Sequence, residues 1–356
     1  MAKVVEKMKV QAPLALYRKY RPSAFDQVRG QTEVVTALRA AIEQDKIAHA
    51  YLFAGGRGTG KTSLARILAS AIGTSEKDLW EMDAASNRGI DEVRALREAV
   101  ATMPFDSRYK VYIIDEAHAL TRDAWGALLK TLEEPPGHVI FILATTELDK
   151  IPETIISRCQ VFNFKKPSHQ TLKKLALDVA KEEGAMLSPA GAELIALMGE
   201  GSFRDTLGIL QKVLTISPDK KLSDEEVAKV VGAPSAVVVN EFLRALGQKD
   251  IAKALAAAHS ALASGTEPNV FLLLATTKVR AVLLLRFAPN LKKELQEQFS
   301  EDDLSILELL AGKDGAAINA QLLAELITAL LETRRAPIAQ LPLELALYRI
   351  FESKIN

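Results

Sequence analysis

Short apolar runs alternate with stretches of helical periodicity through the first half of the chain. Residues 50–54, 111–114 and 139–144 are apolar runs of strand length, and residues 79–83 predict a further short strand. Between these runs, apolar residues recur three and four positions apart, which is the spacing of a helix with one buried face. Strands that are apolar on both faces and alternate with helices predict a parallel sheet that is covered on both sides.

The same periodicity predicts helices around these strands. One covers residues 34–44, before the first strand, and another covers residues 91–100, after the second. Apolar residues between Trp125 and Leu132 mark a third helix, which ends at Pro135 and Pro136 because proline cannot continue the backbone hydrogen bonds of a helix.

Past Phe164 the strand pattern stops, and helical patterns occupy the rest of the chain. The four short helices predicted here cover residues 168–184, 188–199, 203–216 and 223–231. The chain beyond them is rich in Leu and Ala, with helix breaks at residues 300–303, residues 312–315 and Pro337. We therefore expect an α/β domain over residues 1–167, a small helical domain over 168–233 and an all-helical domain over 234–356.

The loop between the first apolar run and the next helix matches the phosphate-binding pattern G-x-x-x-x-G-K-[ST]. Its glycines let successive backbone N–H groups turn inward and form an anion site with the dipole of the following helix. A glycine-rich turn before a helix is the alternative, but the motif requires strand, loop and helix in this order, and the chain has them. The residues predicted to bind nucleotide here are Gly55, Gly56, Arg57, Gly58, Thr59, Gly60, Lys61, Thr62 and Ser63.

Two carboxylates follow the apolar run at residues 111–114. Asp115 can hold Mg²⁺ together with Thr62, and Glu116 can orient and deprotonate an attacking water. A strand that ends in a solvated acidic turn is the alternative, which the upstream Lys61 disfavours. These residues predict an ATPase that uses ATP and Mg²⁺, without separating a motor from a small-molecule kinase.

Charge and cysteine content narrow the function classes. The 356 residues contain 45 Lys and Arg against 45 Asp and Glu, so the formal net charge of zero lacks the basic excess of an autonomous nucleic-acid binder. Any DNA contact must therefore be local. The single cysteine, Cys159, excludes an intramolecular disulfide and a zinc site with several thiolates within this chain.

No stretch of about 18 residues lacks charge, as a membrane span would require. The most apolar stretch, residues 270–288, is interrupted by Lys278, Arg280 and Arg286 and predicts a buried helix. Residues 1–10 lack the apolar core of a secretory signal. We expect a cytoplasmic protein that does not enter a membrane.

The motifs and their order resemble the AAA+ ATPases and, closely, the gamma/tau family of bacterial DNA polymerase III clamp loader subunits. Besides the phosphate loop, the segments that carry this resemblance are residues 17–22 with Phe25, Val28, Gly30 and Gln31, residues 83–86, 115–118, 127–136, 143–146, 157–159 and 201–205. Residues 127–136, Ala-Leu-Leu-Lys-Thr-Leu-Glu-Glu-Pro-Pro, form the most specific match, since ATPases in general do not need them.

The resemblance implies roles for residues whose types alone are ambiguous. Arg158 is similar to an arginine finger that reaches the γ-phosphate bound by a neighbouring subunit, and Arg204 to a lid arginine that senses the γ-phosphate in its own subunit. Thr146 would position water. The residues implied near the adenine are Tyr20, Arg21, Pro22 and Val28.

The resemblance also implies the fold and the partners. The fold would be an AAA+ P-loop domain, a helical lid and a helical collar, within a pentameric hetero-oligomer of clamp loader subunits. ATP binding would open the sliding clamp, and hydrolysis triggered by DNA would release it on primer-template DNA. The residues implied in contacts with the DNA backbone are Arg88, Arg122 and Lys130.

The chain departs from the family pattern after the phosphate-loop helix. Members usually carry a four-cysteine zinc module there, whereas residues 73–78 contain no cysteine, so we expect no zinc at this position. The end at Asn356 is similar to the shorter, gamma-like form. The sequence also allows two other functions. One is a scaffold subunit that does not hydrolyse ATP, and the other is another AAA+ machine such as a replication factor C small subunit or a branch-migration motor.

Overall fold

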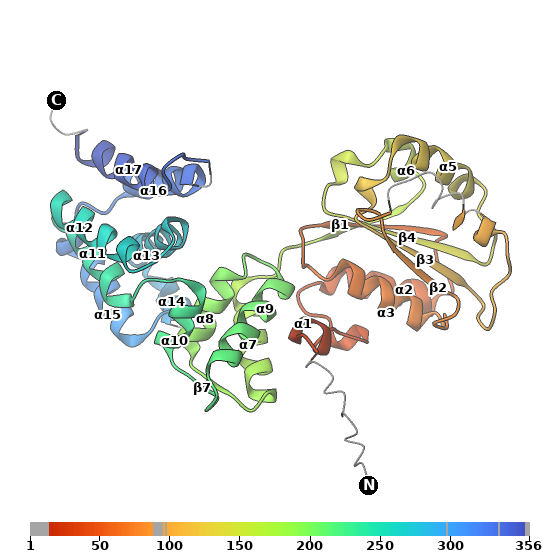
Figure 1. Cartoon of the computed structure of the whole chain (residues 1–356), viewed down its shortest axis with the longest axis horizontal. Coiled ribbons are helices and arrows are strands. Elements are labelled where there is room, and N and C mark those ends of the chain that lie inside the picture. Colours follow the sequence, from red (N-terminus) through yellow and green to blue (C-terminus); the bar gives the residue numbers. More distant parts are fainter. Residues whose placement is uncertain (1–13, 88–94, 97, 297, 334, 353–356) are drawn as a thin grey trace, which may run out of the picture. The chain divides into compact units, whose positions relative to one another are not determined.

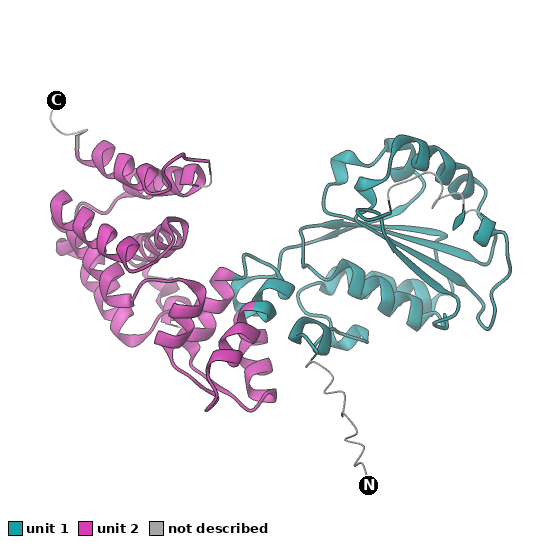
Figure 2. Ribbon diagram, viewed as in Figure 1, with its two compact units in different colours: residues 1–172, 199–208 teal, residues 173–198, 209–356 magenta. Residues whose placement is uncertain are grey.

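A computed structural model describes residues 14–87, 95, 96, 98–296, 298–333 and 335–352 (Figure 1). The chain divides into two compact units, one formed by residues 1–172 with 199–208 and the other by residues 173–198 with 209–356 (Figure 2). The boundaries of the three domains expected from the sequence remain a prediction.

The first unit contains a five-stranded, fully parallel sheet with the order β2-β3-β4-β1-β5. The strands are β1 (Ala50–Gly55), β2 (Leu79–Asp83), β3 (Lys110–Asp115), β4 (Val139–Thr145) and β5 (Gln160–Phe164). The strands predicted near residues 50, 79, 111 and 139 are confirmed. No strand was predicted at β5, because Gln160 and Asn163 are exposed and interrupt its apolar run.

Helices cover both faces of this sheet, as the apolar strands predicted (Figure 1). Tyr112 and Ile114 of β3 pack in one core with Leu128 of α5 (Arg122–Glu133). Val111 and Ile113, which point to the opposite face, pack in a second core with residues of α2 (Thr32–Glu43) and α3 (Lys61–Ala71). Successive side chains of β3 point to opposite faces of the sheet and therefore pack into two separate hydrophobic cores.

Short helices lie before β1 and between the later strands of this unit. They are α1 (Leu16–Lys19), η1 (Phe25–Gln27), η2 (Ala117–Ala119), η3 (Leu148–Lys150) and α6 (Glu153–Ile156). Residues 91–94 and 97 of the helix predicted over 91–100 lie outside the described residues.

A buried aspartate organises the connection at residues 73–78, which leads from α3 to β2. The Asp78 carboxylate is 1% exposed and accepts hydrogen bonds from the backbone N–H groups of Phe105, Asp106 and Ser107. Burial alone would raise the pKa of Asp78, but these hydrogen bonds outweigh it and hold the pKa below its usual range. A carboxylate thus fastens this connection to the loop before β3.

The four helices predicted after Phe164 are confirmed. They are α7 (His169–Glu182), α8 (Pro189–Met198), α9 (Phe203–Ile216) and α10 (Asp224–Val231), and Ser223 and Glu226 form the expected capping box on α10. The expectation that strands stop at Phe164 was wrong in one detail. The two-residue strands β6 (Met186–Leu187) and β7 (Lys221–Leu222) form a parallel pair that is too short to leave a periodic pattern.

The remaining chain is helical. Its elements are α11 (Ala236–Gln248), α12 (Ile251–Ala263), α13 (Pro268–Phe287), η4 (Pro289–Leu291), α14 (Lys292–Gln296), α15 (Glu301–Ala311), η5 (Lys313–Gly315), α16 (Ala320–Thr333) and α17 (Leu341–Glu352). The apolar stretch at residues 270–288 falls in α13, and its Lys278 lies 2.6 Å from Asp303 in a buried ion pair. Within the described residues no single helix is long and apolar enough to cross a membrane, although the bent pair α10 and α11 passes by length and composition.

Candidate active site

The phosphate-binding loop leads from β1 into α3. Gly60 at the N-cap of α3 has φ 102°, no side chain caps the helix, and its first turn contains no acidic residue. The first N–H groups of a helix have no partner within the helix, and its dipole places partial positive charge there. The start of α3 is therefore suited to an anion.

Lys61 is the buried cation of this loop. Lys61 is 6% exposed, and its Nζ donates hydrogen bonds to the carbonyl oxygens of Gly55 at 2.8 Å and Gly56 at 2.9 Å. Burial lowers the pKa of Lys61, whereas Glu116 and Asp115 raise it. A buried ammonium group held by loop carbonyls fits the phosphates of a nucleotide better than it fits an uncharged ligand.

The turn that contains Gly58 carries a contact from a distant part of the chain. Gly58 has φ 70°, and a Cβ built on it would overlap Ser202 Oγ. The Phe203 N–H donates to the Gly58 carbonyl oxygen at 3.0 Å. The start of α9 therefore packs directly on the phosphate-binding loop within the first unit.

Four predicted residues meet at the carboxyl ends of β3 and β4. Thr62 Oγ1 donates to Asp115 Oδ2 at 2.6 Å, and Thr146 Oγ1 donates to Glu116 Oε2 at 3.0 Å. The structure therefore joins the phosphate loop, both carboxylates and Thr146. The hydroxyl and carboxylate of Thr62 and Asp115 are hard oxygen ligands of the kind that Mg²⁺ prefers, usually together with substrate phosphates. The described residues contain no group of three or more His, Cys, Asp or Glu side chains that could hold a metal ion without such a substrate.

The backbone and a histidine restrict Glu116 further. Glu116 has φ 48°, in the left-handed region that residues other than glycine seldom adopt. His118 Nδ1 lies 3.5 Å from Glu116 Oε2 and 3.1 Å from Thr145 Oγ1. On its other side, His118 Nε2 lies 3.2 Å from Glu147 Oε1. His118 thus links the carboxylate of Glu116 to the segment that follows β4.

Arg204 lies above an aromatic ring of the N-terminal segment. Its guanidinium carbon is 4.9 Å from the centre of the Tyr17 ring, and Arg18, with a smaller contribution from Arg204, lowers the pKa of Tyr17. Arg21 lies within electrostatic range of Asp115. Tyr20 directly follows α1, Pro22 lies two residues later, and Val28 directly follows η1, so the residues expected near the adenine belong to one short segment. Their contact with a base stays a prediction.

Arg158 belongs to a different neighbourhood from the phosphate loop. Its Nη2 lies 2.6 Å from Glu133 Oε1 at the end of α5, and its Nη1 donates to the Thr154 carbonyl oxygen at 2.6 Å. Burial raises the pKa of the adjacent Cys159 thiol to about 11, so that thiol is neutral at pH 7. The described contacts do not bring Arg158 to the nucleotide residues of its own chain.

The structure describes two of the three basic residues that are expected to contact DNA. Arg122 begins α5 and Lys130 lies on the same helix, and both are exposed. Arg88 lies outside the described residues.

Sequence reasoning assigned no role to several residues that the structure places beside the site. Gln31 donates from Nε2 to the carbonyl oxygens of Thr59 at 3.4 Å and Lys165 at 2.8 Å, so it connects the loop to the end of β5. Tyr17 and Ser202 were noted only as parts of longer motifs. Their contacts join segments far apart in the chain, and no local spacing predicts such contacts.

Two family models match the chain. Residues 30–89 and 79–168 match the model described as DNA polymerase III, delta subunit, and residues 222–355 match the model for DNA polymerase III subunits gamma and tau domain III. The two matches lie on the sheet-containing part and on the C-terminal helices.

A solved structure with a similar fold is the RuvB Holliday junction branch migration motor of Thermotoga maritima. The TM-score is 0.51 at 24% identity, and the similarity covers 65% of this chain and 79% of that one. It supports the AAA+ fold of the sheet and its flanking helices.

Two similar bacterial proteins are named as tau or gamma/tau subunits of DNA polymerase III. The chain is 40% identical to the tau subunit of DNA polymerase III of Bacillus subtilis, over 80% of this chain and 54% of that protein. It is 33% identical to the gamma/tau subunit of Mycobacterium tuberculosis, over 95% of this chain and 62% of that protein. The chain thus spans between about half and two thirds of the length of these relatives. The match to the gamma and tau domain III model and the similarity to these relatives show that the chain belongs to the gamma/tau family of DNA polymerase III subunits.

Proposed function

We propose that this protein is an ATP-hydrolysing subunit of a DNA polymerase III clamp loader. In this role ATP binding drives the opening of a sliding clamp, and hydrolysis triggered by primer-template DNA releases the clamp. The observation that carries the proposal is the hydrogen bond of 2.6 Å between Thr62 of the phosphate loop and Asp115 at the end of β3. It joins the predicted phosphate and metal ligands in one place.

The residues of this site have separate roles in hydrolysis. Lys61 and the N–H groups at the start of α3 bind the phosphates. Thr62 and Asp115 would hold Mg²⁺, which neutralises charge on the phosphates when bound. Glu116 accepts a proton from the attacking water, and the Thr146 hydroxyl on Oε2 keeps that carboxylate oriented.

Arg204 acts in the same subunit as a sensor of the γ-phosphate. Its position over Tyr17, together with the contact of Phe203 with Gly58, supports this role because both place the start of α9 at the loop. Arg158 acts in trans on the nucleotide of a neighbouring subunit. Its separation from the phosphate loop in the described contacts supports that role.

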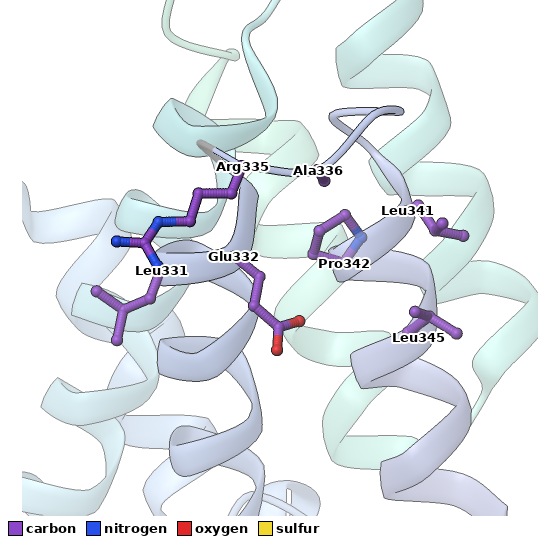
Figure 3. A pocket seen from close by; sticks show the side chains of 7 residues that line it. All are labelled: Leu331, Glu332, Arg335, Ala336, Leu341, Pro342 and Leu345. Carbon is purple, nitrogen blue, oxygen red and sulfur yellow. The ribbon is translucent and has the colours of Figure 1, made fainter.

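The C-terminal helices act as a collar that joins this chain to other clamp loader subunits. A groove of about 680 Å³ lies between the ends of α16 and α17 (Figure 3). Leu331 and Leu345 in its wall are 70% and 37% exposed. Exposed apolar side chains around a groove are typical of a protein interface, and this supports the assembly, which we propose to be a pentamer.

We further propose that exposed basic residues of α5, Arg122 and Lys130, contact the phosphates of primer-template DNA and fix its position without reading its sequence. This role needs no overall excess of positive charge. We place the assembly in the cytoplasm.

The deciding experiment measures ATP turnover by the assembled complex, with and without sliding clamp and primed DNA. We expect clamp and DNA together to raise the rate well above either alone. A rate that responds to neither would contradict the clamp loader role. Turnover unchanged by Glu116→Gln would contradict the catalytic role of that residue and favour a scaffold subunit.

A further inference from the structure

Two segments of the chain hold the Arg158 guanidinium. Thr154 lies in α6 and accepts from Nη1 at 2.6 Å, while Ser157 Oγ lies 3.3 Å from the same nitrogen. Glu133, the last residue of α5, lies 2.6 Å from Nη2. Glu133 also belongs to residues 127–136, the most specific sequence motif of the chain. None of the proposed roles assigns a chemical task to Glu133.

These contacts leave donors on Arg158. A guanidinium carries five N–H groups. The bonds to Thr154, Ser157 and Glu133 use two on Nη1 and one on Nη2. Within the part of the chain that the structure describes, no contact uses the second N–H of Nη2 or the Nε N–H, and these two can bind phosphate oxygens. Glu133 can thus hold the side chain while Arg158 still binds an anion.

The ion pair contributes little to folding. The side chains of Arg158 and Glu133 are 33% and 42% exposed, and pairs exposed to this degree stabilise a protein by about 0–1 kcal/mol. The ion pair therefore acts mainly by orienting the Arg158 guanidinium. An unrestrained arginine samples many rotamers and loses that freedom when it grips a phosphate, whereas a guanidinium already fixed on two sides loses less.

We propose that Glu133 is a positioning residue for Arg158. It holds the guanidinium so that it reaches the γ-phosphate bound by a neighbouring subunit in the orientation needed for hydrolysis. This inference rests on the proposed action of Arg158 in trans. It gives the Ala127–Pro136 motif a part in the hydrolysis carried out by the neighbour.

The test compares Glu133→Gln with Glu134→Gln in the assembled complex. Glu134 is the adjacent exposed carboxylate, so its variant removes the same charge one position away. We expect Glu133→Gln to lower the stimulated kcat about tenfold, as misplaced catalytic groups do, with KM for ATP unchanged. Glu134→Gln should match the wild type. A kcat for Glu133→Gln equal to or above that of the wild type would overturn the inference, and a rise would mean that the pair sequesters Arg158.

A double mutant separates positioning from structural damage. In an Arg158→Ala background, Glu133→Gln should cause no further loss, because the group that it positions is gone. An equal additional loss there would contradict the proposal.

Arg158→Ala alone tests the premise. If that variant keeps full stimulated turnover, the trans role itself fails. If it loses turnover while Glu133→Gln does not, the trans role stands and only the positioning role fails.

Discussion

Lys61 combines burial, a positive charge and a position at the start of α3. Because Nζ already contacts the loop carbonyls of Gly55 and Gly56, its removal takes away both the charge proposed to bind the phosphates and two hydrogen bonds that stabilise the loop. We expect Lys61→Ala to abolish ATP binding, measured by calorimetric titration. Lys77→Ala, a change of an exposed lysine beyond α3, is the control and should bind ATP normally. Normal affinity in Lys61→Ala would refute the phosphate-binding assignment.

Asp78 gives a prediction about stability rather than activity. Asp78→Asn replaces a carboxylate that accepts from the backbone of Phe105, Asp106 and Ser107, so we expect a loss of about 2 kcal/mol at pH 7. The folded pKa of Asp78 lies below the unfolded value of about 3.9. Its stabilisation is therefore complete above that value and is lost as the pH falls toward the folded pKa.

The measurement is urea unfolding of wild type and Asp78→Asn at pH 7 and at pH 3. The difference in free energy of unfolding should be smaller at pH 3. Equal differences at the two pH values would show that the charge of Asp78 does not stabilise the fold.

The phosphate loop requires glycine at a position where α5 does not. Gly58 has φ 70° and faces Ser202, whereas Gly126 on α5 has open space where a Cβ would lie. Gly58→Ala should therefore lower stability by about 1–2 kcal/mol from backbone strain alone and weaken ATP binding. Gly126→Ala, in a helix interior, should raise stability by about 0.5–1 kcal/mol.

Thermal unfolding of both variants checks this contrast. A Gly58→Ala protein as stable as the wild type would mean that the loop and the start of α9 do not pack as described.

Elements with a local pattern could be predicted from the sequence, and contacts between distant elements could not. The three inner strands β1, β3 and β4 carry continuous apolar runs, and the phosphate loop and Asp115-Glu116 are contiguous motifs. β5 was not predicted, because its exposed polar residues at the sheet edge interrupt the apolar run. The pairing of Glu133 with Arg158, and of Tyr17 with Arg204, depends on how α5, α6, α1 and α9 pack, which no spacing along the chain encodes.

The assembled protein is where the proposed chemistry becomes complete. The first unit contains the phosphate loop, the proposed metal ligands, Glu116 and Arg204. It also contains Arg158, whose side chain contacts α5 and α6 and not the phosphate loop. If Arg158 serves a neighbour, each chain supplies most of one site and a single group of another. Hydrolysis then reports that the subunits have come together correctly, and changes that weaken assembly should remove stimulated turnover without removing ATP binding.

The groove between α16 and α17 tests that dependence. We expect the double change Leu331→Glu and Leu345→Glu to disrupt assembly, because it places charge on exposed apolar side chains of the groove. Light scattering of the mixture with the partner subunits should show a smaller complex, and clamp and DNA should no longer stimulate turnover, while the chain still binds ATP. Leu309→Glu, at a side chain of α15 that is 51% exposed and outside the groove, should assemble normally. A complex of full mass in the double variant would mean that the collar contact lies on another surface of these helices.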